Sequence, residues 1–281
     1  MGLICKRSKW NKYNEKLAEN IYQLLEEGKF PTAQEALVGL QLIYKEKWDY
    51  CDWDNPKMWD HKVLGNWGTA RPDNDCVLTD ANIKIDSCSN TLKLWSKHEP
   101  NGIDGLGYKG KEVETRFFSG AQIRSKFTIS PEGRYSALIR IDAPALGVWE
   151  SFWFLHDADV DGKYREIDFE RFAEAEQKNL AATFTTHNKV DKKLMYHRRI
   201  ENFLTTNELL VEFEFVPQHK MVKAFLNGVL AFCTDIRDLM KNYNVLFSVY
   251  VKKWDLPTQT VIDSLPSQFT IYSFKKYEKR R

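Results

Sequence analysis

The sequence predicts an all-β protein, an antiparallel sandwich or jelly roll, with a helical hairpin at its N-terminus. From about Trp48 onward, short segments of alternating apolar and polar residues follow one another, which is the pattern of half-buried strands. Turn sequences such as Pro131-Glu132-Gly133 and Asn227-Gly228 separate these segments. Many short strands, few helices and polar turns together favour two packed antiparallel sheets.

Residues 1–47 differ in pattern and are predicted to form a helical appendage to a β-domain of residues 48–281. Four apolar residues recur at the spacing of one helix face: Leu17, Ile21, Leu24 and Leu25. Gly28 is placed to end this helix, and Thr32 followed by Glu35 has the pattern of a capping box that opens a second one. We expect this hairpin to pack against protein or to dock a protein partner. A DNA-reading helix-turn-helix is the less favoured alternative, because no basic residues line the second helix.

The strands of the β-domain are predicted from period-two alternation and β-branched or aromatic residues. They are 121–127, 135–141, 148–155, 167–172, 181–188, 209–216, 221–226, 245–251 and 269–274.

Composition excludes several classes of protein. With 43% hydrophobic residues among 281, a large core is expected, and the net charge of +2 argues against a nucleic-acid binder. Five scattered cysteines without CxxC spacing predict free thiols, neither a disulfide framework nor a zinc site. No secretory signal and no apolar run of the roughly 18 residues that a membrane span needs is found. We therefore expect a soluble protein that acts without a membrane, a required cofactor or a catalytic metal.

The most informative stretch is Glu166-Ile167-Asp168-Phe169-Glu170. Alternate side chains of a strand emerge on the same face, so the three acids share one face while Ile167 and Phe169 point into a core. Like charges this close repel and perturb one another's pKa, which makes the cluster a candidate site.

Three interpretations of these acids stay open from the pattern alone. Glycoside hydrolysis needs a carboxylate and a carboxylic acid, and glutamates four residues apart on a strand can lean together to the ~5 Å of a retaining pair. A calcium site is possible with three carboxylates, although calcium usually takes loop ligands. A charged surface strand without any function is the third interpretation.

The same stretch resembles the E-[ILV]-D-x-E signature of the family 16 glycoside hydrolases, which include lichenases, laminarinases, agarases, carrageenases and xyloglucan endotransglycosylases. The flanking segments match in order. Residues 118–126 (FSGAQIRSK) resemble the "sG-x-i-x-Sk" strand, 133–141 the "G-x-y-e-a-r-i-k" strand and 147–155 the "G-x-W-p-a-F-W-l-l" strand, with two more matches at 216–228 and 269–274. Five ordered segments across residues 50–277 are far more specific than one short motif.

This resemblance implies a concanavalin A-like jelly roll and a retaining endo-β-glycosidase that cleaves a β-glucan or a galactan of algal or bacterial type. Glu166 would be the nucleophile, Asp168 the assisting carboxylate, and Glu170 the general acid and base. The alternative is a weak or inactive carbohydrate-binding or structural module on the same fold. A structural calcium ion is possible but cannot be deduced from the sequence.

Six further residues are candidates for substrate binding. Trp149 and Trp153 share a strand face, one strand before the acids; His187 lies on the strand after them. The resemblance adds three more candidates: Arg124, Tyr164 and Tyr250.

Three positions depart from the family pattern. Ser136 stands where an acidic residue is common, Val216 where a tryptophan is common, and Arg171 where the nearest branch has an aromatic residue. A basic run follows the acids: Lys192, Lys193, His197, Arg198 and Arg199. If this run reached the acids it would favour a charged polysaccharide, through bidentate arginine contacts.

The cellular location is not fixed by the sequence. Members of the resembled family commonly act outside the cell, so a chain without a secretory signal is expected to be released by lysis or a non-classical route, or to belong to a phage particle.

Overall fold

The structure is a computed structural model. It describes residues 49–50, 59–60, 69–70, 74–86, 91–107, 110, 112–142, 145–156, 165–173, 180–188, 196–201, 208–236, 241–252 and 257–277. The predicted N-terminal hairpin, residues 1–47, lies outside these residues, and the first described strand is β1 (Asp49–Tyr50). It therefore stays a prediction, as does its protein partner.

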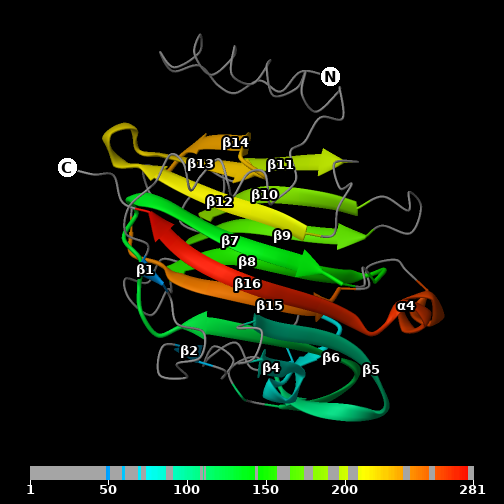
Figure 1. Cartoon of the computed structure of the whole chain (residues 1–281). Coiled ribbons are helices and arrows are strands. Elements are labelled where there is room, and N and C mark those ends of the chain that lie inside the picture. The colour runs from blue at the N-terminus through cyan, green and yellow to red at the C-terminus, as the bar shows by residue number, and fades with distance from the viewer. Residues whose placement is uncertain are drawn as a thin grey trace.

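The described strands form a sandwich of two antiparallel layers (Figure 1). The first, called the β9 layer, contains β2 (Trp59–Asp60), β6 (Val113–Ser125), β8 (Val148–His156), β9 (Arg165–Ala173), β10 (Leu180–Asn188), β11 (Tyr196–Glu201) and β15 (Asn244–Val251). The second, called the β7 layer, contains β1, β4 (Ile83–Asp86), β5 (Thr91–Leu106), β7 (Gly133–Ile141), β12 (Glu208–Val216), β13 (Met221–Leu226), β14 (Val229–Asp235) and β16 (Ser267–Tyr277). The short elements are β3 (Val77–Leu78), η2 (Asp80–Asn82), η5 (Pro217–His219) and α4 (Thr258–Ser264). This arrangement confirms the predicted all-β sandwich.

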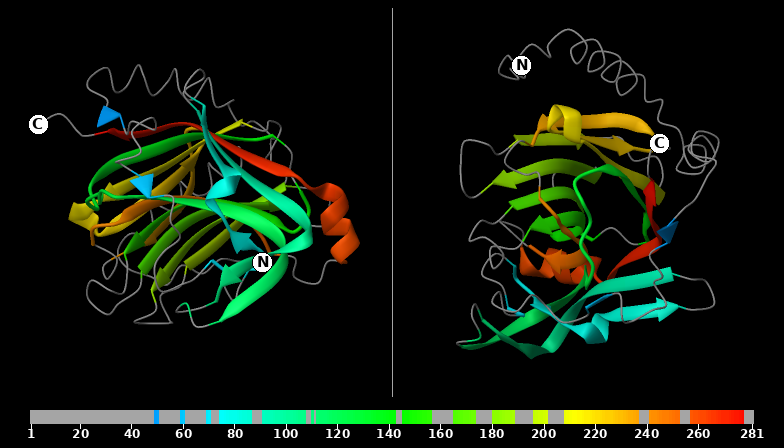
Figure 2. Two further views of the ribbon diagram at one scale, coloured as in Figure 1. Left: turned by 90° about the horizontal axis from the view of Figure 1, so that it is seen from below. Right: turned by 90° about the vertical axis from the view of Figure 1, so that its left-hand side faces the viewer.

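The order of the strands explains how one chain builds both layers. The β9 layer runs β11-β10-β9-β8-β15-β6, and the β7 layer runs β5-β16-β7-β12-β13-β14. The long hairpin of β5 and β6 belongs to both, because β5 pairs with β16 at one end while β6 pairs with β15. Figure 2 shows this hairpin extending along one side of the sandwich. The layers are therefore joined by continuous hydrogen bonding.

Aromatic rings fill the space between the layers. Phe152 of β8 stacks on Phe247 of β15, with ring centroids 4.9 Å apart. Across the core it meets Phe213 of β12 and Phe274 of β16, at 5.6 and 5.9 Å. Burying a phenylalanine this completely stabilises the fold by roughly 1.5–3 kcal/mol. Period-two alternation on β7, β9 and β12 sends alternate residues into this core, as the sequence predicted.

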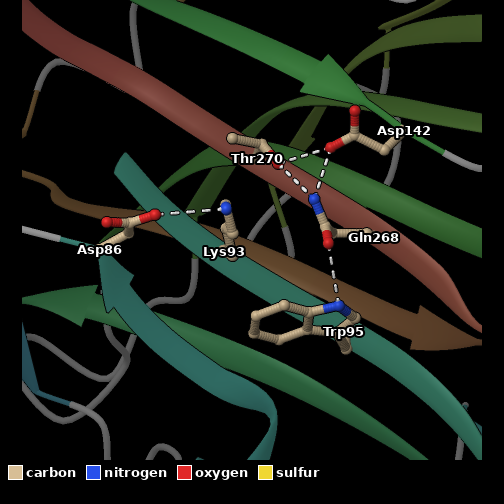
Figure 3. A network of polar contacts seen from close by, with 6 residues as sticks. All are labelled: Asp86, Lys93, Trp95, Asp142, Gln268 and Thr270. Atoms are coloured by element: carbon tan, nitrogen blue, oxygen red, sulfur yellow. Dashed lines mark hydrogen bonds and ion pairs between the residues drawn. The ribbon is translucent and has the colours of Figure 1, made fainter. Parts of the chain in front are cut away.

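A polar network ties together the outer ends of β5, β7 and β16 (Figure 3). The Trp95 indole donates to the Gln268 side chain at 3.1 Å. The Gln268 amide and the Thr270 hydroxyl in turn donate to Asp142, at 2.5 and 2.8 Å. Beside it, Lys93 forms an ion pair with Asp86 at 3.4 Å. These contacts hold three strands in register on the face of the β7 layer that points away from the core.

Several strands were not predicted. β5 passes through Pro100 and Gly102, which are typical of turns, and Gly102 has a positive φ of 76°. β11 falls at the end of the basic run, where no apolar alternation marks a strand. Both are strands because pairing with the neighbouring strand of the chain, β6 for β5 and β10 for β11, overrides weak local preference. Within the described residues, no helix has the length and apolarity to cross a membrane.

Candidate active site

The three acids lie on β9, in the middle of the β9 layer. Ile167 and Phe169 are fully buried in the main core, so Glu166, Asp168 and Glu170 emerge from the opposite side of the sheet, called here the acid face. Asp168 is 3% exposed, whereas the two glutamates are half-buried. The predicted sharing of one face therefore follows from the observed strand.

Strand register decides which residues flank each acid. On the β8 side, Leu155 lies opposite Glu166, Trp153 opposite Asp168, and Ser151 opposite Glu170. On the β10 side, the corresponding residues are His187, Thr185 and Thr183. Directly paired residues of an antiparallel sheet share a face, so each acid sits in a row of its own across the strands.

Glu170 is held by a tyrosine from two strands away. The Tyr250 hydroxyl on β15 donates to Glu170 Oε1 at 2.9 Å. Tyr250 was predicted to bind substrate. The structure shows in addition that it contacts one of the three acids, Glu170. The close approach of β6 to β15 beside Tyr250 depends on Gly120, because a Cβ there would lie 2.5 Å from the Val249 carbonyl oxygen.

An apolar strip lies beside Glu166 and Asp168. It consists of Trp153, Leu155 and Leu246, which form a cluster separate from the main core. The Trp153 indole donates to the Ser248 hydroxyl at 3.1 Å, which fixes the ring orientation. Trp153 is 5% exposed, so it presents only a narrow rim on the acid face.

Trp149 lies at the Glu170 end of the acid face, where two side chains contact its ring. Phe172 stacks against it at a centroid distance of 4.4 Å and an interplanar angle of 13°. The Lys252 ammonium lies 4.7 Å from the ring centroid. Because the ring is 7% exposed and packed in this way, it supports the face beside Glu170 more than it offers an open platform.

Arg124 marks the other side of the acid face. It lies on β6 opposite Leu246, in the row that continues through Trp153 to Asp168. Its guanidinium donates to the Asn244 side chain at 2.6 Å, and Asn244 donates to the Ser125 carbonyl at 2.8 Å. A cation held by two neighbouring strands is suited to bind a polar or anionic ligand group.

Arg171, the departure beside the acid motif, does not reach the acid face. Together with Glu150, its partner on β8, it points into the core, where the two form an ion pair at 2.5 Å. A second contact joins Arg171 Nε to Glu150 at 2.8 Å, and Ser267 of the β7 layer donates to the same carboxylate at 3.0 Å. Burial raises the pKa of Glu150, an effect that the positive charge of Arg171 opposes. This departure therefore changes the support behind the acids and leaves their face unaltered.

The other two departures lie in the opposite layer. Ser136 is on β7 and faces away from the core, where its hydroxyl is 3.5 Å from the Tyr277 hydroxyl. Val216 ends β12. Neither residue is on the strands that carry or flank the acids.

Of the other two predicted residues, the structure places only the backbone of one. Tyr164 lies outside the described residues, so its role stays a prediction. The backbone of His187 is placed on β10, opposite Glu166, in agreement with the predicted neighbouring strand. The basic run also enters the layer: Arg199 on β11 is paired with Thr183, in the row of Glu170.

The hydroxyl residues of the acid face were missed from the sequence. Ser151, Thr183, Thr185 and Ser248 are all buried next to the acids or one strand away. Serine and threonine carry no signal of their own in a strand pattern. Their spacing by two residues within one strand, as in Thr183 and Thr185, was the available signal.

In the described part of the chain, no three histidine, cysteine or acidic side chains are grouped in a way that could hold a metal ion.

The fold of this chain is shared with solved glycoside hydrolases. No protein-family model matches the sequence, and no curated protein matches it significantly. The laminarinase catalytic domain from Thermotoga maritima superposes with a TM-score of 0.64 at 16% identity, covering 84% of this chain and 100% of that one. A β-glucanase from Bacillus licheniformis gives 0.60 at 14% identity, over 84% and 99% of the chains. The kappa-carrageenase from Pseudoalteromonas carrageenovora gives 0.58 at 14%, over 84% and 96%. This is the jelly-roll fold of the family 16 glycoside hydrolases that the sequence resembles.

Proposed function

We propose that this protein is a retaining endo-β-glycosidase of the family 16 type, which cleaves a β-linked polysaccharide. The observation that carries the proposal is that Glu166, Asp168 and Glu170 lie together on the acid face of β9. Solved proteins with the same fold include laminarinases, a β-glucanase and a carrageenase, whose substrates are glucans or carrageenan. A β-glucan or a galactan is therefore the substrate class that we favour.

The proposed reaction proceeds in two displacements. Glu166 attacks the anomeric carbon while Glu170 donates its proton to the glycosidic oxygen, so the leaving sugar departs as an alcohol. A covalent glycosyl ester on Glu166 results. Glu170, now ionised, removes a proton from water, and that water attacks the same carbon and releases Glu166. Two inversions retain the anomeric configuration.

The positions of the two glutamates are compatible with this scheme. Their Cα atoms are separated by four residues of strand, or ~13 Å, and their side chains can converge to the ~5 Å needed by a retaining pair. Asp168 emerges between them and is buried, which places it as the assisting carboxylate of the scheme.

The test is a screen of the full chain against mixed-linkage glucan, laminarin, xyloglucan, agarose and carrageenan, with product analysis. Cleavage that is lost in Glu166→Gln, with retained polysaccharide binding, is the expected result. Glu132→Gln is the matched control, because Glu132 is an exposed turn residue and the change is chemically the same. Proton NMR of the first product should show the substrate's β configuration.

Two outcomes would overturn the proposal. Cleavage of no polysaccharide by the wild type, together with binding of one, would identify a carbohydrate-binding module instead. Cleavage that survives Glu166→Gln would remove Glu166 from the mechanism.

A further inference from the structure

Three hydroxyl groups from three different strands surround Glu170. The Tyr250 hydroxyl donates to Glu170 Oε1 at 2.9 Å. Ser151 on β8 and Thr183 on β10 hold the positions directly opposite Glu170, one on each side. Side chains at such paired positions have Cβ atoms about 5 Å apart, which is within reach of a glutamate carboxylate.

The hydroxyls of Ser151 and Thr183 are buried without a hydrogen bond to any described residue. Their side chains belong to residues that are 3% and 2% exposed, respectively. Leaving a buried hydroxyl without a partner costs about 1–3 kcal/mol. Two such hydroxyls on either side of one acid indicate that they form hydrogen bonds in another state of the site.

Other buried carboxylates of the protein are held differently. Glu150 is paired with Arg171, and Glu212 of β12 accepts two hydrogen bonds from Arg134, at 2.9 and 2.6 Å. A guanidinium can only donate, so it favours the ionised form of its partner. A hydroxyl donates to a carboxylate and accepts from a carboxylic acid, so it suits a group that changes its protonation state.

We infer that Tyr250, Ser151 and Thr183, called the hydroxyl frame, are positioning residues that hold Glu170 through its change between acid and base. The inference rests on the proposed function. In the ionised state of Glu170 all three hydroxyls donate to its carboxylate. In the protonated state, the Glu170 O–H donates a hydrogen bond to one of these hydroxyl oxygens until its proton passes to the leaving sugar.

Charged and titratable residues also occupy positions around Glu170. Glu166 and Asp168 share its strand and its face, and Lys252, just after the end of β15, lies over the Trp149 ring. By backbone register, His187 on β10 and His197, Arg199 and Glu201 on β11 hold acid-face positions, with Arg199 in the row of Glu170. On β8, Glu150 faces the core, and the acid-face positions are occupied by Trp149, Ser151, Trp153 and Leu155. The two positions paired directly with Glu170 are thus both hydroxyl residues of the frame, Ser151 and Thr183.

The direction of the effect follows from the strength of the bonds. Hydrogen bonds to an ionised acceptor are about twice as strong as those to a neutral one, so the frame stabilises the ionised form of Glu170 more than its protonated form. Removing its donors should therefore favour the protonated form. Glu170 acts first as an acid, so the basic limb of the pH profile of kcat/KM should move to higher pH.

The experiment compares Tyr250→Phe and the double variant Ser151→Ala/Thr183→Val with the wild type. The control is Thr186→Val, which removes an equally buried, unbonded hydroxyl from β10 on the core side. The pKa of Glu170 is measured directly by carbon-13 NMR of labelled glutamate, with assignment by Glu170→Gln, and the pH profile is measured on cleaved polysaccharide.

The expected result is a raised pKa of Glu170 in both frame variants and an unchanged pKa in Thr186→Val. An unchanged pKa in folded frame variants, or an equal shift in the control, would overturn the inference. If the wild type cleaves no polysaccharide, the proposed function fails, while the NMR titration still decides whether the frame sets the ionisation of Glu170.

Discussion

Glu150 and Arg171 form a buried ion pair directly behind the strand that carries the three acids. Arg171 stands where the nearest branch of the family 16 pattern has an aromatic residue. Its charge is met by Glu150 on the neighbouring strand, so each residue supplies the charge that the other needs. The pair also reaches Ser267 in the β7 layer, which links the acid strand to the opposite sheet.

Replacing Arg171 by Ala should destabilise the protein by about 3–5 kcal/mol, because Glu150 would be left as an unpaired charge in the core. The double variant Glu150→Leu/Arg171→Leu should recover most of this loss, since an apolar pair of similar volume avoids the cost of burying two charges. Urea unfolding of the wild type and both variants measures the difference. A double variant as unstable as Arg171→Ala would contradict the explanation.

The pH dependence of stability should reveal two buried carboxyls. Burial raises the pKa of Glu150 and of Glu212 above the ordinary value of 4.5, with opposing effects from Arg171 and Arg134. A raised pKa means that the folded state holds its proton more tightly, so this contribution to stability is complete below about pH 4.5 and is lost as the pH rises above it. In Glu150→Gln and Glu212→Gln, the decline from pH 4 toward pH 7 should be smaller than in the wild type.

Tyr243 should make the protein sensitive to alkali. The residue is fully buried, and burial raises its pKa above the ordinary value of 10, an effect that the charge of Arg165 partly offsets. Its contribution to stability is present below pH 10 and should be lost above it, at about 1.4 kcal/mol per pH unit. Tyr243→Phe lacks the ionisable group, so its unfolding free energy should fall less steeply above pH 10. Equal slopes in the two proteins would contradict this assignment.

Changing Asp168 to Asn should lower the activity without changing the shape of the site. The amide keeps the volume of the side chain but removes the carboxyl group between Glu166 and Glu170. We expect kcat to fall by ~10²-fold, in the lower range for a group that assists proton transfer. Steady-state kinetics on a cleaved polysaccharide measure the effect, and an unchanged kcat would contradict the assisting role of Asp168.

The sequence predicted those parts of the fold that follow local periodicity. β8 and β9 were found because their residues alternate or are continuously apolar, and β13 was found with its observed limits. β5 and β14 were missed, since β5 contains Pro100 and Gly102 and β14 follows a tight turn after β13. Their strand structure depends on pairing with distant or adjacent strands, which one sequence does not display.

The candidate site was predictable along a strand but not across strands. A period of two placed Glu166, Asp168 and Glu170 on one face. The register of β9 with β8 and β10 was not available, and so neither Ser151 nor Thr183 could be assigned to Glu170. For the same reason the ion pair of Arg171 with Glu150 on the preceding strand could not be predicted.

The position of β16 has a consequence for how the protein is made. This strand, Ser267–Tyr277, lies between β5 and β7 in the middle of the β7 layer, although it comes last among the described strands. During synthesis, the edges of β5 and β7 that pair with β16 therefore stay unpaired until more than a hundred further residues have been made. Such distant pairings slow folding and expose apolar edges to aggregation. We expect nascent chains that stop before β16 to need a chaperone or to be degraded.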